Sequence, residues 1–284
     1  MRALIVGAGG QLGIDLTAAC VAAGDDVIAV DRAALDVCDR GEVLGAVTSL
    51  RPDVVFNAAA WTAVDACEDD ASRAIDVNGF AVRWLAEACD RVDAHLVQVS
   101  TDYVFDGALD RPYHEYDMPN PRSVYGASKL MGEREALVLG PSAAVVRTAW
   151  VYGEHGNNMV KTIVRLADER DELAFVDDQR GCPTFTADLA LMLRRIALDR
   201  RSGVIHATNQ GATTWFQFAR DVVTAMGKDP GMVRPIATTD LQPPRPAPRP
   251  ANSVLDNAAL RAGGVPLMRD HHEPLTEVVR SLLA

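Results

Sequence analysis

The feature that most constrains the fold is an alternation of short apolar runs and longer amphipathic segments through the first half of the chain. The apolar runs predict strands at residues 3–6, 27–30, 54–57, 96–100 and 144–147. The segments between them predict helices at residues 12–23, 41–50, 71–90 and 125–139. Wholly apolar strands are typical of parallel sheets, which are covered on both faces. Right-handed crossovers then predict an α/β fold with a Rossmann-type doubly wound parallel sheet.

The regular alternation loosens after Tyr152. Helical patterns continue at residues 159–167, 187–198 and 216–226, with short strand candidates at 174–176 and 204–206. Residues 241–250 contain five prolines, which predict an extended loop. We therefore expect a dinucleotide-binding domain over residues 1–152. We expect residues 153–284 to form a smaller, mixed C-terminal substrate-binding lobe that packs closely on it.

Charge and cysteine content exclude several classes of protein. The 284 residues have a net charge of -11, whereas proteins that bind nucleic acids present basic surfaces. No apolar run approaches the roughly 20 residues that a membrane span needs. The five cysteines are widely spaced and lack a Cys-x-x-Cys pattern, so we expect reduced thiols. The prediction is a cytoplasmic protein that binds neither nucleic acid nor membrane, and we assign no metal ligands.

A glycine-rich loop, GAGGQLG at residues 7–13, joins the first predicted strand to the first predicted helix. Glycines permit a tight turn and close approach of the backbone to a phosphate, and the helix N-terminus supplies N–H donors. The spacing departs from Gly-x-Gly-x-x-Gly because Leu12 takes the last position, so the useful glycines are Gly7, Gly10 and Gly13. The context still predicts the pyrophosphate site of a dinucleotide.

The second predicted strand ends at two residues with opposite preferences for the cofactor. Asp31 lies 18 residues beyond Gly13, near the ~20 at which an acidic residue meets the adenosine ribose. A carboxylate there favours NAD, whereas Arg32 could pair with the 2′-phosphate of NADP. The choice between NADH and NADPH therefore stays open.

A tyrosine and a lysine four residues apart, Tyr125 and Lys129, share one face of a predicted helix. An ammonium beside a phenol favours the phenolate and lowers the phenol pKa, so this pair is a candidate acid or base. Thr101 follows the strand at 96–100, at the sheet edge where ligands bind in open α/β sheets. Its hydroxyl can donate to a substrate oxygen. We expect Thr101, Tyr125 and Lys129 to be catalytic.

Together these motifs resemble the extended short-chain dehydrogenase/reductase superfamily. The resemblance rests on the glycine loop, NAAA at 57–60, STDY at 100–103 and YGASK at 125–129. Further segments narrow it to the dTDP-4-dehydrorhamnose reductase family and extend it over nearly the whole chain. They are NAAAWTAVD at 57–65, STDYVFDG at 100–107, RTAWVYG at 147–153, GNN at 156–158, DQRGCPT at 178–184 and RPANSVLD at 249–256.

The resemblance implies a role at each matching position. It implies NAD(P)H-dependent reduction of the C4 carbonyl of dTDP-4-dehydro-L-rhamnose to dTDP-L-rhamnose, with Tyr125 as the proton donor and Lys129 on the nicotinamide ribose. The cofactor would also contact Gly10, Gln11, Leu12, Asp36, Val37, Ala58, Ala59 and Ala60. The sugar nucleotide would contact Thr101, Asp102, Trp150 and Asn158.

Several alternatives stay open at this stage. Trp61 and Cys182 differ from residues common in the family, which leaves room for a reductase or epimerase of another deoxysugar nucleotide. A non-catalytic, reductase-like regulatory subunit is a further alternative, although Thr101, Tyr125 and Lys129 are intact. Basic candidates for the diphosphate are Lys161, Arg165 and Arg180. The sequence also leaves open a homodimer and a Mg²⁺ ion at its interface.

Overall fold

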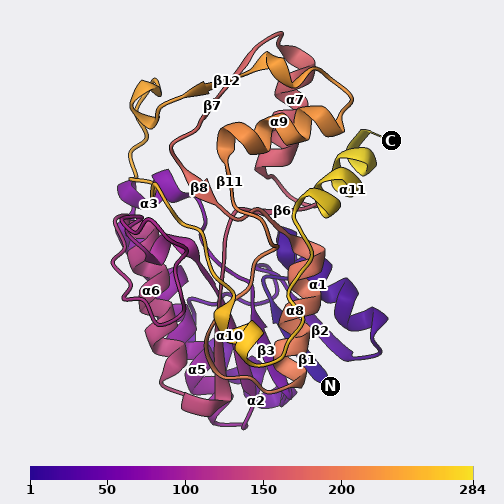
Figure 1. Ribbon diagram of the computed structural model, residues 1–284. Helices are drawn as coiled ribbons and strands as arrows, with labels where there is room; N and C mark the ends of the chain where they lie inside the picture. The colour runs from indigo at the N-terminus through magenta and orange to yellow at the C-terminus, as the bar shows by residue number, and fades with distance from the viewer. Residues whose placement is uncertain (284) are drawn as a thin grey trace.

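Six parallel strands form the central sheet of the protein, in the order β10-β5-β4-β3-β1-β2 (Figure 1). The computed structural model describes residues 1–283. The strands are β1 (Arg2–Val6), β2 (Asp26–Val30), β3 (Val54–Asn57), β4 (His95–Thr101), β5 (Ala143–Thr148) and β10 (Gly203–His206). All five strands expected in the first half are present, and the predicted α/β class is confirmed.

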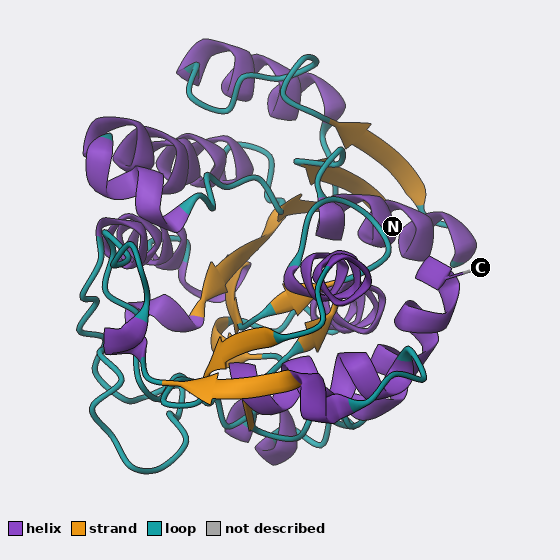
Figure 2. Cartoon of the chain, turned by 90° about the horizontal axis from the view of Figure 1, so that it is seen from above, coloured by secondary structure: helices purple, strands orange, loops and turns teal. Residues whose placement is uncertain are grey.

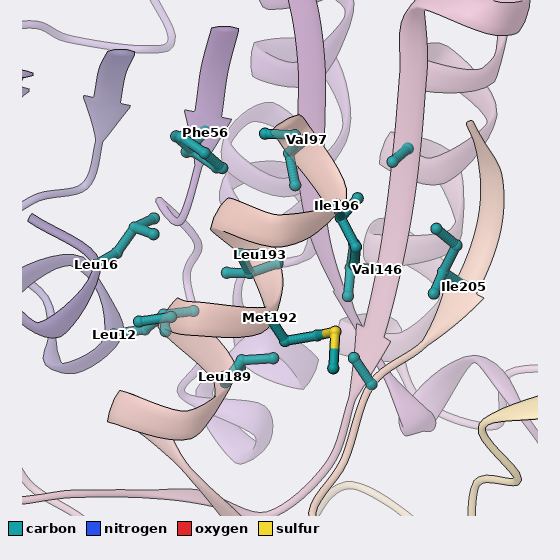
Figure 3. Packing of buried hydrophobic residues seen from close by; sticks show 14 of the residues in the cluster. Leu12, Leu16, Phe56, Val97, Val146, Leu189, Met192, Leu193, Ile196 and Ile205 are labelled. Atoms are coloured by element: carbon teal, nitrogen blue, oxygen red, sulfur yellow. The ribbon is translucent and has the colours of Figure 1, made fainter. Parts of the chain in front are cut away.

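Helices cover both faces of this sheet, as the view from above shows (Figure 2). Side chains alternate between faces along a strand, so Ala3 and Ile5 enter one core while Leu4 and Val6 enter the other. The first core lies under α1 (Gln11–Ala22) and α8 (Thr186–Leu198), where Leu12 and Leu16 face Leu189 and Leu193 (Figure 3). The second lies under α2 (Arg40–Leu50), α5 (Ala81–Asp90) and α6 (Val124–Leu137).

The strand order places a topological switch point between β1 and β3. The chain runs from β1 outward to β2 and then returns to β3 on the opposite side of β1. Loops that leave β1 and β3 therefore diverge and open a crevice beyond the carboxyl ends of these strands. The glycine loop leaves β1 at this point, and Ala58 to Ala60 leave β3.

A second layer of elements gathers above the carboxyl edge of the sheet (Figure 1). It contains α7 (Met159–Glu169), α9 (Trp215–Ala225), α11 (His272–Leu283) and the parallel pair β7 (Leu173–Val176) and β12 (Val233–Ile236) around a core of its own. Residues 241–250 run as a loop, as the prolines predict. The chain leaves the central sheet where β5 ends at Thr148, and the expected boundary near residue 152 stays a prediction. However, α8 and β10 return to the sheet, so residues 153–284 contribute to both parts.

The remaining elements are short. The short helices are α3 (Val64–Asp69), α4 (Ala71–Ile75) and α10 (Ala258–Ala262). The two-residue strands are β6 (Val151–Tyr152), β8 (Arg180–Gly181), β9 (Thr184–Phe185) and β11 (Thr213–Thr214). Across residues 1–283, no helix combines the length and the apolar character needed to cross a bilayer.

The helix expected at residues 71–90 is interrupted by a π-helical turn at Asp76–Phe80. Asn78 lies in this turn and is buried. Its side chain accepts from the backbone N–H of Trp61 and donates to the Trp61 carbonyl and to Ser128 Oγ. The widened turn thus ties the loop after β3 to α6, which carries Tyr125. Such turns are frequent near functional sites.

Candidate active site

The glycine loop fits tightly against the exit of β3. Gly7 has a φ of +82°, and a Cβ atom there would lie 2.6 Å from the backbone nitrogen of Ala59. At Gly13 a Cβ atom would lie 2.2 Å from the Gly7 carbonyl oxygen. Gly10 precedes α1 and no side chain caps that helix, so its first-turn N–H groups remain free to bind an anion. The loop therefore forms a phosphate cradle that only small residues permit.

A pocket of about 490 Å³ extends from this loop over the ends of β2 and β3. Its lining includes Gly7, Gly10, Asp31, Arg32, Asp36, Val37, Ala58, Ala59 and Ala60, as well as Trp61 and Arg73. The structure thus brings together the residues expected around the adenosine half of a cofactor. The Asp31 carboxylate accepts from the N–H groups of Ala33 and Ala34, while the Arg73 guanidinium lies 4.5 Å from the Trp61 ring centroid.

A second cleft, of about 570 Å³, adjoins the first and shares Gly9, Gly10 and Ala58 to Ala60 with it. It is lined by the predicted residues Gln11, Leu12, Thr101, Asp102, Tyr125, Lys129 and Trp150. All three expected catalytic side chains therefore lie in one cleft, beside the phosphate cradle. Gly13 lines neither pocket, and its role is the close packing of α1 on the loop.

Tyr125 lies in the first turn of α6. The helix begins there because Ser123 Oγ accepts from the backbone N–H of Gly126. A Cβ at Gly126 would collide with the Tyr103 carbonyl, so a glycine is needed where the helix packs against this loop. Burial raises the pKa of Tyr125, and a hydrogen bond with Thr101 opposes part of that rise. The expected lowering of this pKa by Lys129 is wrong for this structure, because the ammonium donates to the Val99 carbonyl instead. The phenol therefore stays protonated at neutral pH.

Lys129 is backed by a buried polar cluster that we did not predict. Burial lowers the pKa of Lys129 to about 8, although the Glu133 carboxylate raises it. Glu133 accepts from Arg147 at 2.8 and 2.6 Å and from Ser100 Oγ at 2.6 Å. Two signals pointed to this cluster: Glu133 lies four residues after Lys129 on α6, and Arg147 interrupts an apolar strand.

Thr101 and Asp102 form the end wall of the cleft. Thr101 Oγ1 donates to Asp102 Oδ1 at 3.0 Å, and Asp102 Oδ2 is buried with no hydrogen-bond partner among the described residues. Burial raises the pKa of Asp102 to about 6, and the hydrogen bond from Thr101 opposes part of that rise. A buried acceptor that borders a cleft is suited to a ligand hydroxyl, because an unpaired buried oxygen is costly.

An aromatic pair also lines the cleft. Trp150 has a φ of +47°, a conformation that few bulky residues adopt outside functional sites. Its ring stacks on Trp215 of α9, with centroids 3.6 Å apart and an interplanar angle of 7°. Both rings line the cleft. Trp215, which we did not predict, thus brings the upper layer of the fold into the site.

The whole chain, residues 1–284, matches the family model described as RmlD substrate binding domain. A dTDP-4-dehydrorhamnose reductase from Streptomyces griseus is 46% identical over 97% of this chain and 92% of its own length. The chain belongs to the dTDP-4-dehydrorhamnose reductase family. The predicted resemblance is confirmed, and the protein is accordingly a nicotinamide-dependent oxidoreductase.

Two further relatives bear on cofactor and substrate. The crystal structure of dTDP-4-dehydrorhamnose reductase from Bacillus anthracis in complex with NADP matches with a TM-score of 0.94 and 36% identity, covering 99% of each chain. A dTDP-4-keto-6-deoxy-D-glucose reductase from Streptomyces niveus is 40% identical over 97% of this chain and 96% of its own length. The family thus includes more than one named sugar nucleotide.

One residue expected in the substrate site of this reductase lies outside the cleft. The Asn158 amide donates to Gln11 Oε1 and to the Gly153 carbonyl, and its oxygen accepts from the Lys161 N–H at the start of α7. All its polar atoms are therefore engaged in holding the loop between β6 and α7. The preceding residue, Asn157, lines the cleft instead.

The basic residues proposed for the diphosphate are not gathered at the reductase cleft. Lys161, Arg165 and Arg180 do not line it, and Arg165 forms a surface pair with Glu169. A different arginine, Arg249, lies beside Tyr103, which lines the cleft. Arg249 forms a two-pronged ion pair with Asp65, in which Nη1 donates to Oδ1 and Nη2 donates to Oδ2 at 2.8 Å. This pair ties the proline-rich loop to α3. The position of Arg249 at the end of the five-proline loop was the available signal.

Proposed function

We propose that this protein reduces the C4 carbonyl of dTDP-4-dehydro-L-rhamnose to dTDP-L-rhamnose, with reduced nicotinamide dinucleotide as the hydride source. The observation that carries this proposal is the convergence of Thr101, Tyr125 and Lys129 in a cleft beside the phosphate cradle. The relatives named as dTDP-4-dehydrorhamnose reductases support the substrate.

The chain's own residues supply the remaining chemistry. When bound, the cofactor supplies the hydride that the carbonyl carbon accepts. Tyr125 donates its phenolic proton to the carbonyl oxygen, because burial keeps that phenol protonated. When its proton turns from Asp102 Oδ1 to the substrate, the Thr101 hydroxyl donates a hydrogen bond to the same oxygen. Both donors act where negative charge develops, so they stabilise the transition state more than the ground state.

Asp102 and the aromatic pair position the sugar nucleotide. The unpaired Oδ2 of Asp102 accepts from a sugar hydroxyl, and the stacked rings of Trp150 and Trp215 exclude water from the part of the cleft that they line. Lys129 holds the nicotinamide ribose through its ammonium. Its anchor on Val99 keeps the ammonium between α6 and β4.

We further propose that NADPH is preferred over NADH. Arg32 and Arg73 both line the adenosine pocket and can pair with a 2′-phosphate. Within its own turn, Asp31 Oδ1 accepts from the N–H groups of Ala33 and Ala34, which leaves only Oδ2 for the ribose. The NADP complex of the Bacillus anthracis relative supports this preference.

A turnover assay tests the proposal. The purified protein is mixed with NADPH or NADH and dTDP-4-dehydro-L-rhamnose, and loss of nicotinamide absorbance is followed, with NMR of the product. The expected result is faster oxidation of NADPH and formation of dTDP-L-rhamnose. Faster turnover of dTDP-4-keto-6-deoxy-D-glucose would favour the second substrate, which the Streptomyces niveus relative supports.

Absence of NADPH oxidation with either sugar, together with stable binding to a partner enzyme, would support the regulatory alternative. Repeating the assay with EDTA tests the Mg²⁺ ion, and the mass of the protein in solution tests the homodimer. The cytoplasmic location, the homodimer and the Mg²⁺ ion stay predictions.

A further inference from the structure

A cluster of two histidines and one aspartate lies where α9 meets the start of α11. Asp221, His271 and His272 each offer one potential ligand atom, and these atoms all lie within 4.8 Å of one another. None of the three residues lines the cofactor pocket or the catalytic cleft. The cluster is therefore separate from the reductase chemistry.

His271 supplies an independent sign that a ligand is expected here. Its side chain is only 1% exposed, and its Nδ1 lies 3.2 Å from the Gln210 carbonyl oxygen. Its Nε2 is buried and has no hydrogen-bond partner among residues 1–283. A buried ring nitrogen without a partner costs free energy, and a metal ion would satisfy it.

The other two side chains are oriented in the same way. Asp221 Oδ1 accepts from Gln217 Nε2 at 2.8 Å, whereas Oδ2 is buried without a hydrogen bond and lies 3.4 Å from His272 Nε2. His272 Nδ1 lies 2.6 Å from Asp270 Oδ1. Each histidine is thus held through Nδ1 by an oxygen acceptor, and neither Nε2 makes a hydrogen bond within residues 1–283, which is the usual arrangement of metal-binding histidines.

We propose that Asp221, His271 and His272 bind one divalent ion of the zinc type. Two imidazole nitrogens and one carboxylate oxygen form a donor set that Zn²⁺ accepts, whereas Mg²⁺ prefers oxygen ligands alone. The His272 side chain is 59% exposed, which opens a path for the ion and for a water molecule as the fourth ligand.

The ion ties the C-terminal helix to the helix that begins at Trp215. Asp221 lies six residues beyond Trp215, so the two side chains are roughly 9 Å apart along α9. Because the three ligands come together only in the folded chain, the ion stabilises the folded state and raises its melting temperature. The site is therefore structural, and it fixes the helix that carries one wall of the catalytic cleft.

Metal titration of matched variants tests this site. Tag-free protein, first treated with EDTA and dialysed, is titrated with ZnCl₂ in a calorimeter. Wild type is expected to bind one Zn²⁺ ion per chain. His272→Ala and Asp221→Asn should each weaken that affinity at least ~10-fold. His155→Ala is the control, because its imidazole is similarly exposed and faces a single carboxylate, Asp15, at 3.7 Å.

Two further readouts separate a built site from surface binding. Zn²⁺ should raise the melting temperature of wild type and of His155→Ala but not of His272→Ala. MgCl₂ should not raise the melting temperature of any of these proteins. Co²⁺ should give the visible absorption bands of a four-coordinate site in wild type and in His155→Ala, but not in His272→Ala. Failure of wild type to bind Zn²⁺, or equal affinity in His272→Ala and His155→Ala, would overturn the proposal.

Discussion

The ammonium of Lys129 donates a hydrogen bond to the carbonyl oxygen of Val99, 2.7 Å away. This contact joins α6, which carries Tyr125, to β4, which ends at Thr101. This one side-chain-to-backbone hydrogen bond therefore holds the helix that carries Tyr125 and Lys129 against the strand that ends at Thr101. The lysine ammonium is held by the strand backbone and does not pair with the tyrosine.

Replacing Tyr125 by Phe should lower kcat by roughly 10²- to 10⁴-fold, because it removes the proton donor for the developing alkoxide. The ring still packs against Tyr103, with which Tyr125 makes an edge contact at 5.5 Å between centroids. NADPH affinity, measured by fluorescence titration, should stay within about twofold of wild type. Turnover close to wild type would show that another group delivers the proton.

The pH dependence of the free enzyme should reflect Lys129. Burial lowers its pKa to about 8, so the ammonium is present below that pH and is lost above it. The pKa of Tyr125 is raised, so the phenol does not titrate in the same range. We expect kcat/KM for the cofactor to fall above about pH 8. The residual activity of Lys129→Met should lack this alkaline decline; a decline that persists would assign it to another group.

The fold could be predicted from the sequence because the strands of its sheet are short and almost wholly apolar. The five apolar runs and the glycine loop determine the sheet locally, and the cleft then follows from the rule that ligands bind at carboxyl ends of parallel strands. The return of β10 to the sheet could not be predicted, because a short run such as residues 204–206 carries no information about its partner strand.

The sequence predicted which residues form the site better than it predicted their pKa values. Tyr125, Lys129 and Thr101 follow from local motifs, but their pKa values depend on burial, which only the packed structure supplies. Asn158 illustrates the same limit, because the sequence does not distinguish a helix cap from a substrate ligand. Pairs such as Asp65 and Arg249 join residues 184 positions apart and leave no local pattern.

Glu133→Gln should destabilise the protein by about 3–5 kcal/mol, because it leaves the buried Arg147 guanidinium without its counter-ion. Arg147 and Glu133 side chains are 3% and 2% exposed. Glu135→Gln on the same helix is the matched control, since its partner Arg83 is 50% exposed and such pairs contribute at most about 1 kcal/mol. Urea unfolding at pH 7 measures both; equal losses would contradict a special role for the buried pair.

Gly13→Ala should weaken NADPH binding by about tenfold or more, because the new methyl group would displace the Gly7 carbonyl and with it the phosphate cradle. Overpacking of this kind also costs about 1–3 kcal/mol of stability. Gly45→Ala serves as the control. A Cβ there meets nothing within 4 Å in the exposed middle of α2, so this variant should gain about 0.5–1 kcal/mol and keep its cofactor affinity.

Asp102→Asn should stabilise the protein at neutral pH while it lowers activity. Burial raises the pKa of Asp102 to about 6 from the ordinary 3.8. The folded state therefore holds this proton more tightly than the unfolded state, and stability falls as pH rises from about 4 to 6. Above pH 6 the buried charge costs on the order of 3 kcal/mol, which the asparagine removes. Loss of the acceptor for the sugar hydroxyl should raise KM for the sugar nucleotide.

Asp106→Asn is the matched control for this prediction, and it should change the stability at neutral pH in the opposite direction. Hydrogen bonds from the Ala108 N–H, the Asn120 amide and the Tyr113 hydroxyl lower the pKa of Asp106. Its stabilising effect is therefore present above the ordinary carboxylate pKa and is lost as pH falls, so Asp106→Asn should lower the melting temperature at pH 7. For Asp102→Asn the gain in melting temperature should be present at pH 7.5 and shrink towards pH 4. A gain that is independent of pH would show that the Asp102 charge is not its cause.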